Sequence, residues 1–133
     1  MIYLPILLPL VFALISLLLW KSARLQKWVA VGGTLVMVGV NIGLLVAVTR
    51  EEVLTSQVGS WQAPFGISLV VDHLSAILLL AGSVAALASA VYSLAGIDDT
   101  RVRWGYFPLF HFLMMGVNGA FSTGDLFNLY VWF

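Results

Sequence analysis

The stretch WVAVGGTLVMVGVNIGLLVAVT, residues 28–49, decides the fold class, because it carries no charged side chain and a single amide, Asn41. An α-helix needs about 20 predominantly apolar residues to cross the hydrocarbon core of a bilayer, and this run is long enough. Comparable runs lie on either side of it. We therefore predict an all-α, polytopic membrane protein with four transmembrane helices, over residues 2–20, 28–49, 73–97 and 104–122.

A fifth helix is predicted to begin at residue 126, with Asp125 as its N-cap. Residues 126–133 rise only about 12 Å, against roughly 30 Å of hydrocarbon, so they are too short to span. The sequence therefore indicates one membrane unit, a fragment whose fifth helix is truncated.

The composition supports a membrane protein and excludes several function classes. Hydrophobic residues make up 62% of the chain and charged residues 9%, whereas a soluble domain carries about 25% charged residues. The balanced charge offers no basic surface to nucleic acid. Because the chain has no cysteine, disulfides, thiolate metal sites and iron–sulfur clusters are excluded. The two histidines are far apart in sequence, so we expect no metal and no cofactor.

The links between the apolar runs predict the orientation. Residues 21–27 carry three basic side chains and residues 98–103 carry two, and with four spans both links face the same side. Arg50 is the only basic side chain on the opposite side, next to Glu51 and Glu52. By the positive-inside rule the basic links are cytoplasmic and the N-terminus lies outside. Basic residues follow the first run rather than precede it, as in a retained helix and unlike a cleaved signal peptide.

Residues 50–72 form the one long link. Two short β-prone runs, Gln57 to Trp61 and Gly66 to Val71, flank a turn signal that contains proline. We predict a short β-hairpin at the outer interface, where Trp61 and Phe65 suit the level of the lipid headgroups.

Three side chains are candidates for a proton or cation pathway, and each has a structural alternative. Asp125 either caps the helix that starts at residue 126 or forms a mouth for proton or cation entry. His111, inside the fourth run, either relays protons or stays neutral and hydrogen-bonded to a neighbouring helix. Asp72 is expected chiefly to cap the third run, with Ser75 three residues on. No residues stand at catalytic spacing, so no catalytic residue is predicted.

Four further residues are predicted to serve helix packing. Gly39 and Gly43 form a GxxxG pair in the second run, and small residues let helix backbones approach closely in membranes. Asn41 and Asn118 can donate hydrogen bonds across helices. We therefore expect these spans to pack against other helices rather than against lipid alone.

The stretch GVNGAFSTGDLFNLYVWF, residues 116–133, resembles the D subunit of the Mrp/Mnh multisubunit Na+/H+ antiporters. These D subunits are related to the antiporter-like membrane subunits of respiratory complex I and of membrane-bound hydrogenases. Weaker matches are the start LPILLP, residues 4–9, and Val71-Asp72 with Ser75. All 133 residues fit the N-terminal part of such a protein.

The resemblance implies a mechanism whose central group lies outside the chain. In the family, a glutamate follows directly after the pair that matches Trp132 and Phe133, and it works with lysines of later helices in proton translocation. Asp125 matches the acidic residue of the family's turn. The implied protein is a proton-translocating subunit in the cell (inner) membrane. Its partners are the other antiporter subunits, the lipid bilayer, Na+ and H+.

Two alternatives remain open at this point. The first is an antiporter-like subunit of an NADH:quinone oxidoreductase or hydrogenase, which shares the fold and the buried glutamate. The second is a short membrane scaffold protein that does not transport. Redox genes beside the parent gene favour the first, and a stop codon directly after the codon for Phe133 favours the second.

Overall fold

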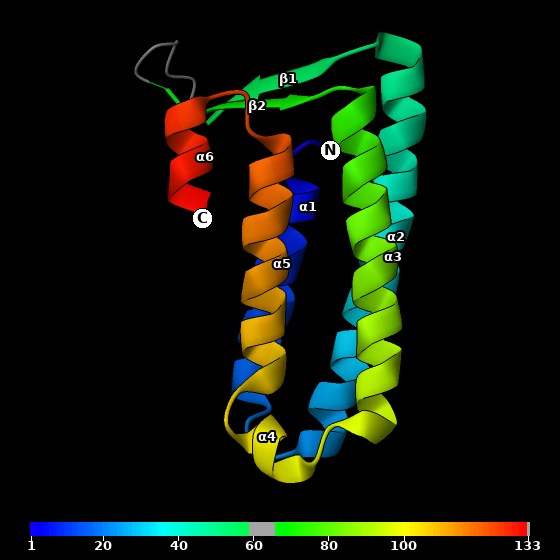
Figure 1. The fold of residues 1–133 in the computed structure, drawn as a ribbon, viewed down its shortest axis with the longest axis vertical. Helices are drawn as coiled ribbons and strands as arrows, with labels where there is room; N and C mark the ends of the chain where they lie inside the picture. Colours follow the sequence, from blue (N-terminus) through cyan, green and yellow to red (C-terminus); the bar gives the residue numbers. More distant parts are fainter. Residues whose placement is uncertain (59–65, 133) are drawn as a thin grey trace.

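The computed structural model describes residues 1–58 and 66–132, and most of them are helical. Among the described residues, four long helices run side by side along the longest axis of the molecule, with two short helices and two strands at its ends (Figure 1). Along the chain they are α1 (Leu4–Leu18), α2 (Ala23–Glu51), β1 (Leu54–Gln57), β2 (Ser68–Val71), α3 (His73–Gly96), α4 (Asp99–Arg103), α5 (Tyr106–Ser122) and α6 (Leu126–Trp132).

The long helices associate as two main pairs, α1 with α5 and α2 with α3, and α1 also contacts α2. The hairpin, the N-terminus and α6 lie at one end of the bundle, and α4 lies at the other (Figure 1). We call these the hairpin end and the α4 end. The chain therefore runs to the α4 end in α1 and α3 and returns to the hairpin end in α2 and α5.

Capping side chains explain where three of the helices begin. The side-chain oxygens of Ser22, Asp72 and Asp98 accept hydrogen bonds from backbone N–H groups three residues on, at 3.4, 2.8 and 2.8 Å. Each bond satisfies a donor that the first helical turn leaves without a partner. Asp72 therefore fulfils the predicted capping geometry at the start of α3.

The prediction of four transmembrane helices is confirmed only in part. By length and composition, α2 and α3 can cross a membrane. Helix α1 is apolar but has 15 residues, which is shorter than the predicted run 2–20, and α5 has 17. Helix α5 lies inside the predicted run 104–122 and begins at Tyr106, because Gly105 adopts φ +90° and separates α4 from α5. Only glycine enters this left-handed region readily.

The predicted β-hairpin is present, but its first strand begins at Leu54, before the predicted start of the run Gln57 to Trp61, whose residues 59–61 are not described. Strand β1 pairs antiparallel with β2, with Leu54 opposite Val71 and Gln57 opposite Ser68. The earlier register follows from alternation, because Leu54 packs against the apolar core while Thr55 faces outward. Trp61 and Phe65, predicted at the headgroup level, lie outside the described residues.

The interior of the bundle is an apolar core that includes several polar side chains, and its outer faces are apolar. Large side chains such as Leu35, Ile77 and Leu113 are 54–64% exposed on the long helices. Soluble proteins rarely leave extended apolar surfaces uncovered, so this distribution suits lipid as the solvent. The buried polar residues are Ser16, Gln26, Thr34, Asn41, Ser83, Ser93, His111, Asn118, Ser122 and Asn128.

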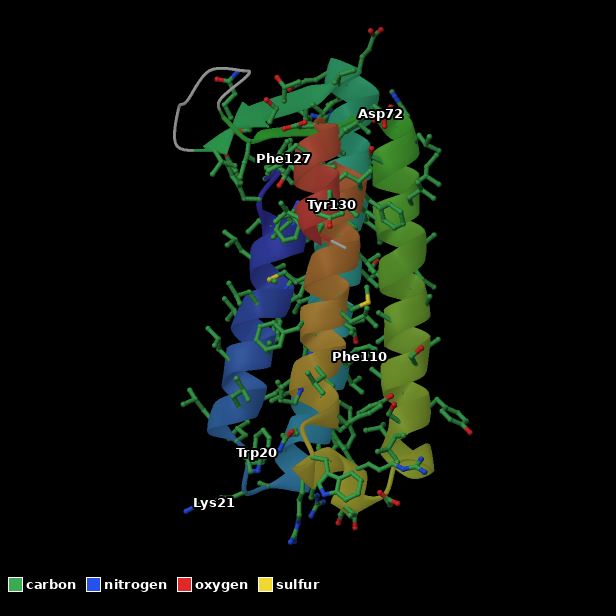
Figure 2. The ribbon with its side chains drawn as sticks, turned by 60° about the vertical axis from the view of Figure 1, so that its left-hand side comes forward. Trp20, Lys21, Asp72, Phe110, Phe127 and Tyr130 are labelled. Atoms are coloured by element: carbon green, nitrogen blue, oxygen red, sulfur yellow. The ribbon has the colours of Figure 1, made fainter. Side chains whose placement is uncertain are left out.

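The charged side chains gather at the two ends. Figure 2 shows Lys21 near Trp20 at the α4 end and Asp72 at the hairpin end. Lys27 forms an ion pair with Asp99 at 3.2 Å, which joins the 21–27 link to the 98–103 link. The two basic links therefore lie at the same end of the bundle, as the sequence predicts.

Candidate functional site

The candidate site is the turn between α5 and α6 with the polar side chains of α5 behind it. Asp125 Oδ1 accepts a hydrogen bond from Phe127 N at 3.0 Å, so the carboxylate caps the short helix α6. Asn128 is buried, and its Nδ2 donates to Thr123 Oγ1 at 2.8 Å. Asp125 also lines an open groove of ≈ 240 Å³ together with Thr123, Gly124 and Leu129. A carboxylate that caps a helix while facing a groove is compatible with both of its predicted roles.

The turn is tied to the hairpin by the backbone. Gly124 N donates to Ser68 O at 2.9 Å, and Thr123 forms an isolated antiparallel bridge with Leu69. Residues 123–124 therefore extend the hairpin by a short third strand segment. The hairpin thus does more than cover the bundle end, since it fixes the point at which α6 begins.

His111 is 1% exposed and lies deep between α1 and α5. Its ring stacks on Phe12 at a centroid distance of 5.9 Å and meets the edge of Phe110 at 5.6 Å. Neither ring nitrogen has a hydrogen-bond partner among the residues that the structure describes. His111 is therefore a buried imidazole between two aromatic rings. Charging such a group carries a high desolvation cost unless a partner or water reaches it.

The three predicted pathway residues do not converge. His111 lies about 16 Å along α5 from Ser122, the last residue before the turn. Asp72 is exposed at the start of α3, and its carboxylate bonds to Ser75 rather than to the turn. The backbone N–H of Ser75 is the main cause that holds the pKa of Asp72 below its usual 3.8, helped by the Ser75 side chain. Within the described ranges, no three His, Asp or Glu residues gather as metal ligands.

Both asparagines of the packing prediction bridge helices. Asn41 Nδ2, on α2, donates to Leu79 O of α3 at 3.0 Å. Asn118 Nδ2, on α5, donates to Pro5 O of α1 at 2.7 Å. The second bond replaces a missing hydrogen bond of α1, because Pro9 has no N–H to donate to the carbonyl of Pro5, four residues before it.

The glycine pair behaves differently from the asparagines. A Cβ at Gly39 would meet nothing within 4 Å, and one at Gly43 would meet only the side chain of Met1. That this pair packs against another helix stays a prediction, and such a helix would have to come from outside the described residues. Gly33, one of two glycines one to two turns before the pair, does make a close contact, because a Cβ there would lie 2.7 Å from the Phe12 ring of α1.

Curated relatives match the chain over its whole length. It is 35% identical over 133 residues to the D subunit of the Na(+)/H(+) antiporter of Alkalihalophilus pseudofirmus and 33% identical over 132 residues to that of Bacillus subtilis. It is 37% identical over 134 residues to putative antiporter subunit mnhD2 of Staphylococcus haemolyticus. The chain spans 27% of the length of each of these relatives. No protein-family model matches it.

Two solved structures share the fold. A chain of the Mrp complex from Dietzia sp. matches with a TM-score of 0.88 and 28% identity, over 98% of this chain and 24% of that one. A chain of the membrane-bound sulfane sulfur reductase, an archaeal respiratory membrane complex, matches with a TM-score of 0.91 and 28% identity, over 98% and 27%. The fold and the polar turn thus define part of an antiporter-like membrane subunit.

Within that class, the chain belongs to the family of the D subunits of Na+/H+ antiporters. The resemblance predicted from residues 116–133 is confirmed, and it extends over the full chain.

Proposed function

We propose that the chain is the N-terminal part of a proton-translocating subunit of a multisubunit Na+/H+ antiporter. The observation that carries the proposal is the whole-length similarity to the antiporter D subunits. In the complete complex, cytoplasmic Na+ is exchanged for external H+ at the expense of the proton motive force. The other antiporter subunits are its partners, and the chain is a transporter component rather than a catalytic enzyme.

On this proposal, all four long helices cross the membrane with the N-terminus outside, and α6 begins a fifth. The five basic side chains at the α4 end support that orientation under the positive-inside rule. Helices α1 and α5 are short for a span, and a short helix is accommodated by bilayer thinning and by flanking aromatic residues. Trp20 and Trp104 flank them at the α4 end, where they are 44% and 77% exposed.

The described part of the chain supplies the outer entrance rather than the proton-carrying pair. We assign Asp125 the role of an entry group for protons or cations and His111 that of a relay, with Asp72 at the same outer end. The resemblance implies a glutamate of the family directly after Phe133 as the proton-carrying group. A glutamate and a lysine that approach and separate in a low-dielectric interior can load and release a proton.

The test uses the complete complex with the full-length subunit in inverted membrane vesicles. Adding Na+ should raise the pH inside wild-type vesicles, as a pH-sensitive dye reports, and vesicles without the full-length subunit should give no signal. Asp125→Asn should reduce exchange, because Asn keeps the helix cap and removes the charge. Asp98→Asn is the matched control, because Asp98 caps α4 at the opposite end of the bundle, and it should exchange close to the wild-type rate.

Two results count against the proposal. If adding Na+ does not change the pH inside wild-type vesicles, the proposed antiporter function is wrong. An Asp125→Asn complex that assembles normally and exchanges at the wild-type rate would leave Asp125 as a helix cap only.

The structural match to a respiratory membrane complex favours one second candidate, a membrane arm of a redox complex. In that case the same helices would conduct protons driven by electron transfer. The genes beside the parent gene distinguish the two candidates. Genes for small antiporter subunits support the antiporter, and genes for redox subunits support the second candidate.

A further inference from the structure

We propose that Gly119 and Gly124 are positioning residues that fix α6 against α5 and the hairpin, so that the segment following α6 enters the bundle in one register. The inference rests on the proposed function, because it concerns how the proton-carrying glutamate implied after Phe133 is positioned. Its evidence is a pair of close contacts, one at each end of α6.

The first contact is made by Trp132, the last residue of α6. A Cβ added to Gly119 would lie within 2.6 Å of three atoms of the Trp132 indole. A Cβ added to Gly116 would lie 3.1 Å from the Trp132 carbonyl oxygen. The indole therefore rests directly on the backbone of α5, and we call this contact the Trp132 seat.

The backbone of α5 does not itself require glycine at the seat. Among the described glycines only Gly105 has a positive φ, so Gly119 sits in ordinary helical geometry. Glycine in a helix interior is less favourable than alanine. The space occupied by the Trp132 ring accounts for a residue that helix propensity alone disfavours.

The second contact lies at the beginning of α6. Gly124 donates its N–H to Ser68 O at 2.9 Å, and a Cβ there would collide with the side chain of Val70. The entry to α6 is therefore held by β2, and glycine is the residue that permits the close approach. These two contacts place the described part of α6 against α5 and β2.

Trp132 also joins α6 to the hairpin end of the core. It packs against the cluster that contains Ile6 and Leu69, and it lines a wholly apolar recess with both of them. The opposite face of α6 is open, with Phe127 and Tyr130 pointing away from the bundle (Figure 2). One face of α6 thus packs against this chain, and these contacts define its rotation.

A methyl group at residue 119 would displace the indole by roughly 1 Å to restore ordinary contact distances. Misplacement of a reacting group by about 1 Å can reduce a rate on the order of 100-fold. We therefore expect Gly119→Ala to lower the maximum exchange rate about 10- to 100-fold, with the half-saturating Na+ concentration unchanged.

The experiment measures exchange and thermal stability of the complete complex with the full-length subunit. Gly82→Ala is the matched control, because it adds the same methyl group to a helical glycine with nothing within 4 Å. Trp132→Phe in the Gly119→Ala background should restore at least part of the rate, since the smaller ring leaves room for the methyl group. Gly124→Ala should resemble Gly119→Ala, without rescue by Trp132→Phe.

The outcomes separate the two proposals. Wild-type complexes without Na+/H+ exchange defeat the proposed function. Wild-type exchange together with an assembled Gly119→Ala complex of unchanged rate defeats the positioning role. A Gly119→Ala complex that loses rate but is not restored by Trp132→Phe also defeats it, because the loss then arises elsewhere. A melting temperature equal to that of Gly82→Ala shows that the seat itself is absent.

Discussion

At the scale of single residues, Asn118 shows how a polar side chain compensates for a proline inside an apolar helix. Its amide donates to Pro5 O, the carbonyl that Pro9 leaves without a helical donor. In the hydrocarbon core of a bilayer there is no water to donate a hydrogen bond to an unpaired backbone carbonyl. The bond therefore repairs α1 and joins it to α5 at the same point.

Replacing Asn118 tests this coupling. Asn118→Ala should destabilise the protein by about 1–2 kcal/mol, because the Pro5 carbonyl becomes buried and unpaired. In a Pro9→Ala background the loss should shrink, since residue 9 then supplies the missing N–H. The shift in melting temperature of the detergent-solubilised full-length protein measures both effects. Equal shifts in the two backgrounds would disprove the repair.

Asp72 gives a prediction for acidic conditions. The Ser75 backbone N–H lowers the pKa of Asp72 below its usual 3.8, so the folded state favours the carboxylate. The stability from the cap is present above pH 3.8 and is lost as the pH falls through the lower pKa of the folded state. Asp72→Asn keeps a capping oxygen without titrating. The melting temperature of the wild type should therefore fall relative to that of Asp72→Asn below pH 3.8. A difference between the two melting temperatures that does not change with pH would refute the role of the cap.

At the scale of elements, neighbouring glycines of α2 face different surroundings. A Cβ at Gly33 would press on the Phe12 ring of α1, while one at Gly32 meets nothing within 4 Å. Gly33→Ala should destabilise the α1–α2 contact by about 1–3 kcal/mol through overpacking. Gly32→Ala should be neutral or slightly stabilising, because alanine favours the helix. Melting temperatures of the two full-length variants compare them directly, and a reversed order would contradict the packing.

The sequence predicted the elements that depend on local patterns. Residues 28–49 and 73–97 are uncharged over most of their length, and both lie inside or close to the observed helices. It placed the start of the first strand too late and missed the break at Gly105, since both depend on contacts distant in sequence. Leu54 is held by the core, and a Cβ at Gly105 would lie 3.3 Å from the Trp20 ring. The Trp132 seat could not be predicted for the same reason. Helix periodicity indicates which residues share a face, but it does not indicate which other helix that face contacts.

At the scale of the whole molecule, polar side chains are buried within an apolar core, and large apolar side chains cover the outer faces. Asparagine, serine and histidine side chains lie inside beside leucine and valine, many further leucine and valine side chains are exposed, and charges lie at the two ends. That arrangement suits lipid around the middle of the bundle. It also gives each end its own electrostatic character, which is the basis of the proposed orientation.

The placement of the bundle across the membrane is the claim on which the entire account depends, and reporter fusions within the full-length protein test it most directly. Fusions at residues 25 and 101 should report the cytoplasm, because both belong to the basic links at the α4 end. A fusion at residue 58, beside β1 at the hairpin end, should report the outside. Any other pattern, such as residues 25 and 101 on opposite sides, would contradict the account.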